Sequence, residues 1–297
     1  MNVRSKEEKR FELAGHIVMI TLCFFAIMPF LLLIASSITD HDVVVREGYK
    51  FIPKEFSLEA YRYIFGEWAQ IGHAYLITII VTVSGTFLSI MITTMFAFGL
   101  NYTDIPGTKV LFIMCLFTML FNGGIVATYY TYSNFIHIKN TIFALIVPGL
   151  MMGAFNVILV KNYIKNNIPG ELIEAAEMDG AGPIYIFFKL IIPLSTPILA
   201  TIGLMGAVMY WNDWTNGLYY ITNSKLYSIQ QLLNQMNSSI QYLISNANNL
   251  GNVDLSTLPS TTMRMAIAVV AILPILCTYP FFQKYFAKGI TVGAVKG

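Results

Sequence analysis

The feature that most restricts the fold of this chain is a stretch without Asp, Glu, Lys or Arg between Glu67 and Asp104. A helix that crosses a bilayer needs about 20 mostly apolar residues, because hydrocarbon offers no partner to an unpaired backbone N–H or C=O group. The whole chain is 56% hydrophobic and 11% charged, whereas soluble domains carry about 25% charged residues. These properties exclude a water-soluble globular fold and indicate a membrane protein.

Six stretches of the chain are long and apolar enough to cross a membrane as helices. The fourth contains Pro148 and Gly149, which favour a kink packed against neighbouring helices rather than a break in the chain. The sequence therefore predicts an all-α, polytopic membrane protein with six transmembrane helices. The approximate bounds of these spans are 13–38, 73–101, 110–132, 141–160, 190–211 and 263–282.

Lys and Arg residues in the short loops indicate the orientation, because they favour the cytoplasmic side of a membrane. A basic cluster of Arg4, Lys6, Lys9 and Arg10 precedes the first span. With this cluster inside, most Lys and Arg residues of the chain are cytoplasmic, and six spans place both termini there. The predicted inner segments include 1–12, 166–189 and 283–297, and the two long outer loops are 39–72 and 212–262.

The sequence also excludes several functions. Its formal net charge of +2 is too small to indicate nucleic-acid binding. The chain lacks the GxxxxGKS/T, HExxH and GxSxG motifs, so we predict no ATP site of that type, no enzymatic activity and no cofactor of its own. The three cysteines lie in apolar stretches without metal-binding spacing, so we interpret them as small core residues and predict no metal site. They are Cys23, Cys115 and Cys277.

The segment between the fourth and fifth spans has the pattern of a short surface helix. Pro169 suits the first turn of a helix, and Glu171 and Glu174 complement the positive end of its dipole. Two alanines continue the helix and the glycines of 180–182 end it. From this spacing alone, an ordinary amphipathic surface helix and a docking element for a partner both remain open.

This segment closely resembles the EAA loop of ABC importer permeases. The motifs that match, in order, are Glu174-Ala175-Ala176, Asp179-Gly180-Ala181 and Leu190-Ile191-Ile192-Pro193-Leu194. Two further segments look like the carbohydrate-importer branch that includes the maltose-type permeases, and the last looks closest to the subfamily of lipoprotein-linked, complex-sugar systems. They are Tyr210-Trp211-Asn212-Asp213-Trp214 and the chain end from Lys288 to Gly297. One departure is Ala127, where that subfamily has Pro.

The resemblance implies a type I importer permease fold, in which cytoplasmic coupling helices seat in a cleft of a separate ATP-binding subunit. It implies that Glu174 pairs with an Arg of that subunit and that Gly180 makes the bend between the coupling helices. The coupling residues carried over are Glu171, Glu174, Ala175, Ala176, Asp179, Gly180, Ala181 and Pro193. Those of the tail that would contact the ATP-binding subunits are Gly293, Val295, Lys296 and Gly297. Those of the outer loop that would contact a binding protein are Asn237, Gln241, Asn246 and Asn249.

Sugar contacts are predicted from side-chain chemistry, because sugars bind to aromatic faces together with amide and hydroxyl groups. The alternative is that the Trp and Tyr side chains anchor helices at the membrane interface, as they do in many membrane proteins. The candidates for the substrate path are Asn122, Tyr129, Tyr130, Asn156, Trp211, Asn212 and Trp214.

By this resemblance the chain is the permease subunit of an ATP-driven, binding-protein-dependent importer of sugars, with oligosaccharides as the expected substrates, in a bacterial plasma membrane. The implied partners are a second permease subunit in a heterodimer, two ATP-binding subunits that carry ATP and Mg, membrane lipid, and an extracytoplasmic sugar-binding protein, which in some systems is a lipoprotein. The alternative is an ion-coupled secondary transporter of small polar solutes. Such a transporter usually has a buried ionisable residue or unwound helices in two repeated halves, and this sequence has neither.

Overall fold

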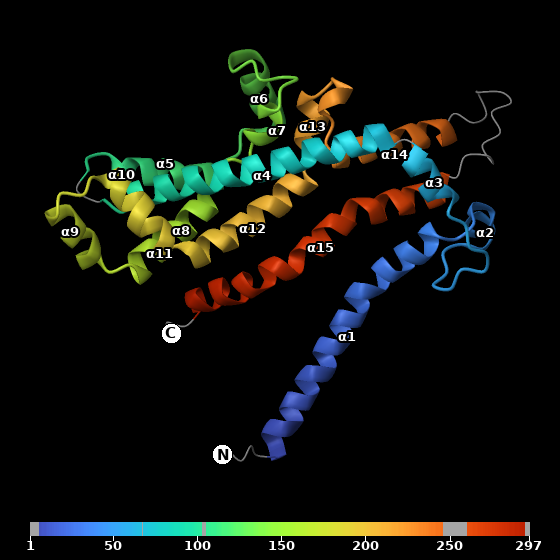
Figure 1. Cartoon of the computed structure of the whole chain (residues 1–297), viewed down its shortest axis with the longest axis horizontal. Helices are drawn as coiled ribbons and strands as arrows, with labels where there is room; N and C mark the ends of the chain where they lie inside the picture. Colours follow the sequence, from blue (N-terminus) through green and yellow to red (C-terminus); the bar gives the residue numbers. More distant parts are fainter. Residues whose placement is uncertain (1–5, 67, 103–104, 246–259, 295–297) are drawn as a thin grey trace. The chain divides into compact units, whose positions relative to one another are not determined.

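The computed structural model of the protein describes residues 6–66, 68–102, 105–245 and 260–294 (Figure 1). Within these ranges the chain is built from helices, and its one extended pairing is an antiparallel bridge between Thr39 and Phe56. The chain divides into two compact units. Unit 1 is Met1–Trp68 with Gln235–Leu273, and unit 2 is Ala69–Asn234 with Pro274–Gly297.

Unit 1 begins with a long apolar helix, α1, at Lys6–Ser37, followed by α2 at His41–Glu47 and α3 at Glu59–Gly66. The part of α1 from Arg10 to Ser37 is long and apolar enough to cross a membrane, and its most apolar stretch is not buried within the chain. Hydrogen bonds close the loop that follows α1, among them one from the Asp40 N–H to the Glu55 carbonyl over 3.0 Å. The hydroxyl groups of Ser37 and Tyr61 lie 2.8 Å apart, and the Ser57 N–H donates to the Ile38 carbonyl over 3.0 Å.

Helix α4, Trp68–Gly99, organises unit 2, because small side chains on its buried face let α12, Thr196–Asn212, approach closely. A Cβ atom added to Gly85 would lie 2.6 Å from the Tyr210 ring, and one added to Gly203 would lie 2.9 Å from Ile90. Of the three cysteines, Cys115 is buried, whereas Cys23 and Cys277 are exposed, so the interpretation as core residues fits Cys115 alone.

The third and fourth predicted spans are interrupted in the structure. Where 110–132 was expected to be continuous, α5 ends at Leu120, α6 begins at Gly124 and the π-helix η1 begins at Thr131. Where 141–160 was expected, α7 ends at Ile146 and α8 begins at Ala154, so the region of Pro148 and Gly149 is a break rather than a kink. The bounds are α5 Thr108–Leu120, α6 Gly124–Tyr130, η1 Thr131–Phe135, α7 Phe143–Ile146 and α8 Ala154–Asn167.

Side chains from other elements stabilise this break. Tyr210 donates from its buried hydroxyl to the Ile146 carbonyl over 2.9 Å, and Asn216 donates to the Pro148 carbonyl over 3.0 Å. Gly149 adopts a left-handed φ of 71°, which a residue with a side chain seldom tolerates. Two of the carbonyl groups freed by the break, those of Ile146 and Pro148, are therefore satisfied within the protein, as a membrane environment requires.

The remaining helices are short and follow one another through bends, except for the longer helices α12, α14 and α15. Among the described residues, Arg10–Ser37 and α4 are each long and apolar enough to span a membrane, and Pro183–Leu194 with α12 forms a third candidate bent by 82°. Shorter apolar helices occur at α5 and at Thr261–Cys277 of α15. The bounds of the other elements are α9 Gly170–Met178, α10 Pro183–Ile186, η2 Phe187–Ile191, α11 Ile192–Leu194, α13 Thr215–Tyr220, η3 Ser224–Leu226, α14 Ile229–Ser245 and α15 Ser260–Ala294.

We predict that Gly85→Ala destabilises the protein by about 1–3 kcal/mol, because the new methyl group overpacks the contact with Tyr210 and displaces its hydroxyl from Ile146. Gly15→Ala is the matched control, since a Cβ atom there meets nothing within 4 Å. Thermal unfolding of the purified protein in detergent measures both. Equal midpoints for the two variants would contradict the close packing of α4 on α12.

Candidate functional site

The predicted coupling segment folds as the nine-residue helix α9, and its C-terminal end has a specific cap. The Gly180 N–H donates to the Glu177 carbonyl over 2.9 Å, and the Ala181 N–H donates to the Ala176 carbonyl over 2.9 Å. This pair of bonds is the Schellman motif, and it needs the left-handed φ of 81° that Gly180 adopts. The cap therefore fixes the direction in which the chain leaves α9.

One side of α9 is attached to the bundle. Ile173, Ala176 and Ala181 pack against a core cluster that includes Ile164 and Phe187. Small and branched apolar side chains at these positions let the short helix lie close to α8, α10 and η2. The helix is therefore held at its base although none of its own residues is fully buried.

A hydrogen bond also joins α9 to the region just beyond α4. The Tyr102 hydroxyl donates to the Glu177 carboxylate over 3.1 Å, and the Tyr102 ring meets that of Phe98 edge to face with centroids 5.1 Å apart. Burial, followed by the neighbouring Glu177 carboxylate, raises the pKa of Tyr102 to about 12, so the hydroxyl keeps its proton at neutral pH. Sequence analysis missed this pair, because its members are 75 residues apart.

The other side of α9 and the start of α10 present an exposed surface of mixed character. Four large apolar side chains are exposed there by 45–89%: Leu172, Met178, Ile184 and Tyr185. The carboxylates of Glu171 and Glu174 are exposed beside them, as are Ala175 and Asp179. Apolar side chains that project among acidic groups are typical of a protein-docking surface.

The chain after α9 leads into the membrane through a sharp bend. Helix α10, the π-helix η2 and α11 follow one another, and η2 buries Phe187 and Ile191 in the core. Pro193 lies in α11 and is exposed, directly before the 82° bend into α12. The Tyr163 hydroxyl of α8 donates to the Leu194 carbonyl at this bend over 3.3 Å. The bend is thus tied to α8.

On the predicted outer side, Asn140 joins two segments of unit 2 that are distant in sequence. Its side-chain oxygen accepts hydrogen bonds from the Thr222 and Asn223 N–H groups over 2.7 and 3.1 Å, and its own N–H donates to the Tyr220 carbonyl over 3.0 Å. Asn140 adopts a left-handed φ of 58°, which Asn tolerates better than most residues.

The seven residues predicted for the substrate path lie in different local settings. Tyr129 stacks on Tyr220 with ring centroids 5.6 Å apart, and Tyr130 meets the ring of Phe135. Trp211 is buried on α12 and lines a mostly apolar cavity of about 470 Å³ with residues of α4 and α15.

The polar members of that set serve local structure or are partly exposed. Asn122 accepts a hydrogen bond from the Gly124 N–H over 2.9 Å, and Asn212 donates to the Val208 carbonyl over 2.9 Å. Asn156 is half-buried on α8, and Trp214 is 45% exposed after α12. A sugar path through all seven residues therefore remains a prediction.

The outer loop 212–262 contains helices in its described part. Asn237 and Gln241 are exposed on α14, where a spacing of four residues places them on one face. Ile229 and Leu232 at the start of the same helix are buried. Asn246 and Asn249 lie outside the described residues, as do Val295, Lys296 and Gly297 of the tail, whereas Gly293 is in α15.

Comparisons with known proteins agree with this architecture. Residues 107–292 match the family described as binding-protein-dependent transport system inner membrane component. The polygalacturonan/rhamnogalacturonan transport system permease protein YtcP of Bacillus subtilis is 38% identical over 95% of this chain and 96% of its own length. Protein LplC of the same organism is 35% identical over 91% of this chain and 90% of its own.

A solved structure is also similar: a chain of a bacterial ABC transporter involved in the import of the acidic polysaccharide alginate. It is 26% identical, with a TM-score of 0.80, and the match covers 96% of this chain and 100% of that one. Together with the family match, this similarity extends over nearly the whole sequence and includes the segment of α9. The chain therefore belongs to the family of binding-protein-dependent transport system inner membrane components, as a permease subunit of a carbohydrate ABC importer.

Proposed function

We propose that α9 is the element through which a separate ATP-binding subunit moves this permease. The observation that carries the proposal is the division of α9 into two sides: one is fixed by the core and by Tyr102, and the other exposes acidic and apolar groups. Because α9 is attached to the helix bundle in this way, a partner that displaces α9 also displaces the bundle. Glu174 pairs with an Arg of that partner through a charge-assisted hydrogen bond.

The other coupling residues act through the shape of the segment. Ala175 is small and lets the partner surface approach, while Asp179 and Gly180 set the turn after α9. Pro193 lies where that segment bends into α12. ATP and Mg then belong to the ATP-binding subunits, and this chain supplies the lever and half of the translocation path without catalysing a reaction.

A second permease subunit supplies the other half of the path, and we assign its contact to the lobe of α6 and η1. Figure 1 shows α6 projecting to one side of α4. The lobe exposes large apolar side chains, with Val126 80% and Phe135 74% exposed, and Lys and Arg are absent between Lys109 and Lys139. The backbone of this lobe is interrupted before α6 and forms a π-helix after it. Within a membrane, irregular backbone packs against protein or borders water and does not face lipid.

The names of two relatives support a proposal for the substrate class. YtcP is named for polygalacturonan and rhamnogalacturonan, and the similar solved transporter imports alginate, which are polymers that contain acidic sugars. We assign to this chain the import of oligosaccharides from such polymers, delivered by an extracytoplasmic binding protein that contacts the outer loop, including Asn237, Gln241 and, beyond the described residues, Asn246 and Asn249. Both termini then face the cytoplasm, where Gly293 and the residues after it lie against the ATP-binding subunits.

We predict that Gly180→Ala reduces uptake more than it reduces insertion of the complex. Alanine at a φ of 81° costs about 1–2 kcal/mol, so the Schellman cap opens and α9 loses its fixed direction. The control is Gly182→Ala, where φ is −72° and a Cβ atom meets nothing within 4 Å. Uptake and binding-protein-stimulated ATP hydrolysis in proteoliposomes measure the effect. Wild-type values of both for Gly180→Ala would overturn the role of the cap.

We predict that Tyr102→Phe weakens coupling, because it removes an exposed hydrogen bond to the Glu177 carboxylate, worth about 0.5–1.5 kcal/mol. The ratio of sugar molecules imported to ATP hydrolysed should fall while the complex still assembles. Tyr63→Phe is the matched control, since Tyr63 is 49% exposed on α3 and is not part of the docking surface. An unchanged ratio in Tyr102→Phe would show that the bond does not hold α9 during transport.

We predict that Val126→Arg prevents the second permease subunit from co-purifying with this chain, because a charge is placed in an apolar protein contact. Ile113→Arg is the control for the cost of an Arg within the membrane, since Ile113 is 64% exposed on the regular helix α5. Retention of the second subunit by Val126→Arg would place the contact elsewhere.

A further inference from the structure

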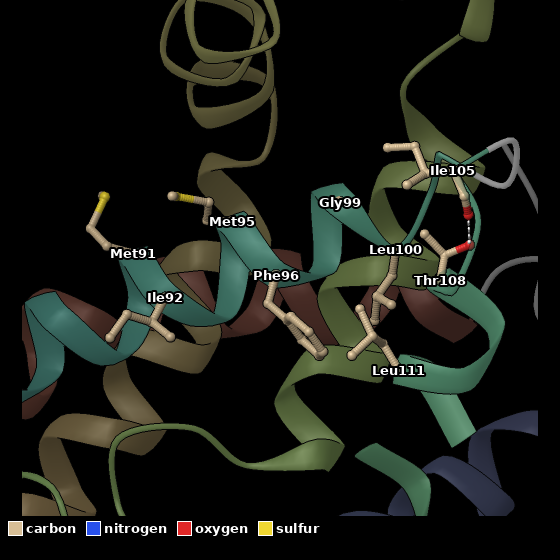
Figure 2. Close-up of a pocket in the computed structure, with 9 residues that line it drawn as sticks. All are labelled: Met91, Ile92, Met95, Phe96, Gly99, Leu100, Ile105, Thr108 and Leu111. Carbon is tan, nitrogen blue, oxygen red and sulfur yellow. Dashed lines mark hydrogen bonds between the residues drawn. The ribbon is translucent and has the colours of Figure 1, made fainter. Parts of the chain in front are cut away.

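A groove lies between the C-terminal end of α4 and the start of α5 (Figure 2). Its volume of about 610 Å³ falls in the range of small-molecule sites. Figure 2 shows Met91, Met95 and Gly99 along α4, with Ile105 and Leu111 on the segment that leads into and through α5. None of the functional residues described above lines this groove.

The lining of the groove offers no free polar group. Its one polar side chain is Thr108, whose hydroxyl donates to the Ile105 carbonyl over 3.0 Å, the bond drawn in Figure 2. The backbone at the end of α4 is also paired, since the Leu100 N–H donates to the Phe96 carbonyl over 3.0 Å. The part of a ligand that lies in this groove must therefore be apolar. The flexible side chains of Met91 and Met95 suit an occupant that is flexible itself.

The position of the groove along α4 indicates which part of the membrane it meets. A helix of 32 residues is about 48 Å long, whereas the hydrocarbon core is about 30 Å thick. The groove takes up the last turns of α4, and the polar Asn101 and Tyr102 follow directly. One end of the groove therefore faces hydrocarbon and the other reaches the polar surface of the membrane.

Positive charge lies at that polar end. Lys109 is exposed and directly follows Thr108 of the groove lining. An apolar recess with a cation at its polar end complements an acyl chain attached to an anionic head group.

We infer that this groove is a binding site for an anionic phospholipid, with one acyl chain along Gly99 and the head group at Lys109. A protein segment is the less suitable occupant here. Most of the groove lining belongs to the regular helices α4 and α5, whose backbone pairs within each helix, unlike the interrupted backbone of α6 and η1. The site also adjoins the turn from which Tyr102 reaches Glu177, so the lipid supports the end of α4 that holds α9.

To test this lipid site, a substitution places a larger side chain in the groove. A Cβ atom at Gly99 meets nothing within 4 Å, so Gly99→Leu fits the fold and occupies the space of the acyl chain. Gly15→Leu is the matched control, since Gly15 on α1 is equally open. The purified importer complex is reconstituted with equal phosphatidylglycerol and phosphatidylcholine and is then extracted in mild detergent. Native mass spectrometry counts the retained lipids.

We expect wild type and Gly15→Leu to retain one tightly bound phosphatidylglycerol, and Gly99→Leu to lose it. Lys109→Gln should lower the preference for phosphatidylglycerol over phosphatidylcholine about fivefold, the effect of one basic residue near an anionic surface. Met95→Trp, which narrows the groove from an exposed position, repeats the test if Gly99→Leu fails to assemble.

Two results would overturn the site. One is retention of phosphatidylglycerol by Gly99→Leu or Met95→Trp at the wild-type level. The other is a cross-link from Met95→Cys to the second permease subunit in native membranes, which would identify a protein as the occupant. Neither result bears on the coupling role of α9, which the Gly180 and Tyr102 variants test separately.

Discussion

The structure depends on how interrupted helices satisfy their backbone in a membrane. The hydrocarbon of a membrane offers no water to carbonyl groups freed at the end of a helix. At the end of α7, Tyr210 donates a hydrogen bond to the Ile146 carbonyl, and Asn216 donates one to the Pro148 carbonyl. Tyr210 can reach Ile146 only because Gly85 leaves room for its ring on α4. One residue without a side chain thus permits the contact that lets α7 and α8 be separate helices. The short helices α7 and α13 then have fixed places beside α4.

Two kinds of surface remain exposed once unit 2 has folded, and they differ in backbone rather than in apolar character. The groove between α4 and α5 is lined mostly by residues of regular helices and suits lipid, whereas the lobe of α6 and η1 has an interrupted backbone and suits protein. Hydropathy alone does not separate these surfaces, because Met95 and Val126 are both large, apolar and exposed. The state of the backbone hydrogen bonds does separate them.

Sequence patterns predicted the parts of the fold that depend on local chemistry. The all-α membrane class follows from uncharged stretches, and the end of α9 follows from Asp179-Gly180-Ala181, where the cap needs a residue that tolerates a positive φ. The breaks in the third and fourth spans were not predicted, because their stabilising partners lie far away: Tyr210 is 64 residues from Ile146. The bond between Tyr102 and Glu177 was missed for the same reason. The aromatic and amide residues predicted for a sugar path were chosen because their side chains can bind sugars. The structure places them in different local settings.

The bend between α11 and α12 has a mechanical consequence. Because the two arms meet at 82°, a displacement along the first arm is almost perpendicular to the axis of the second. On the proposed coupling role, a thrust delivered from α9 along α10 and η2 would tilt or shift α12 sideways instead of sliding it lengthwise. Such a shift would change the width of the space that α12 borders, and the cavity beside Trp211 lies against that helix. With α12 crossing the membrane, as predicted, the arm before Ser195 lies close to the membrane plane, so the displacement stays within that plane.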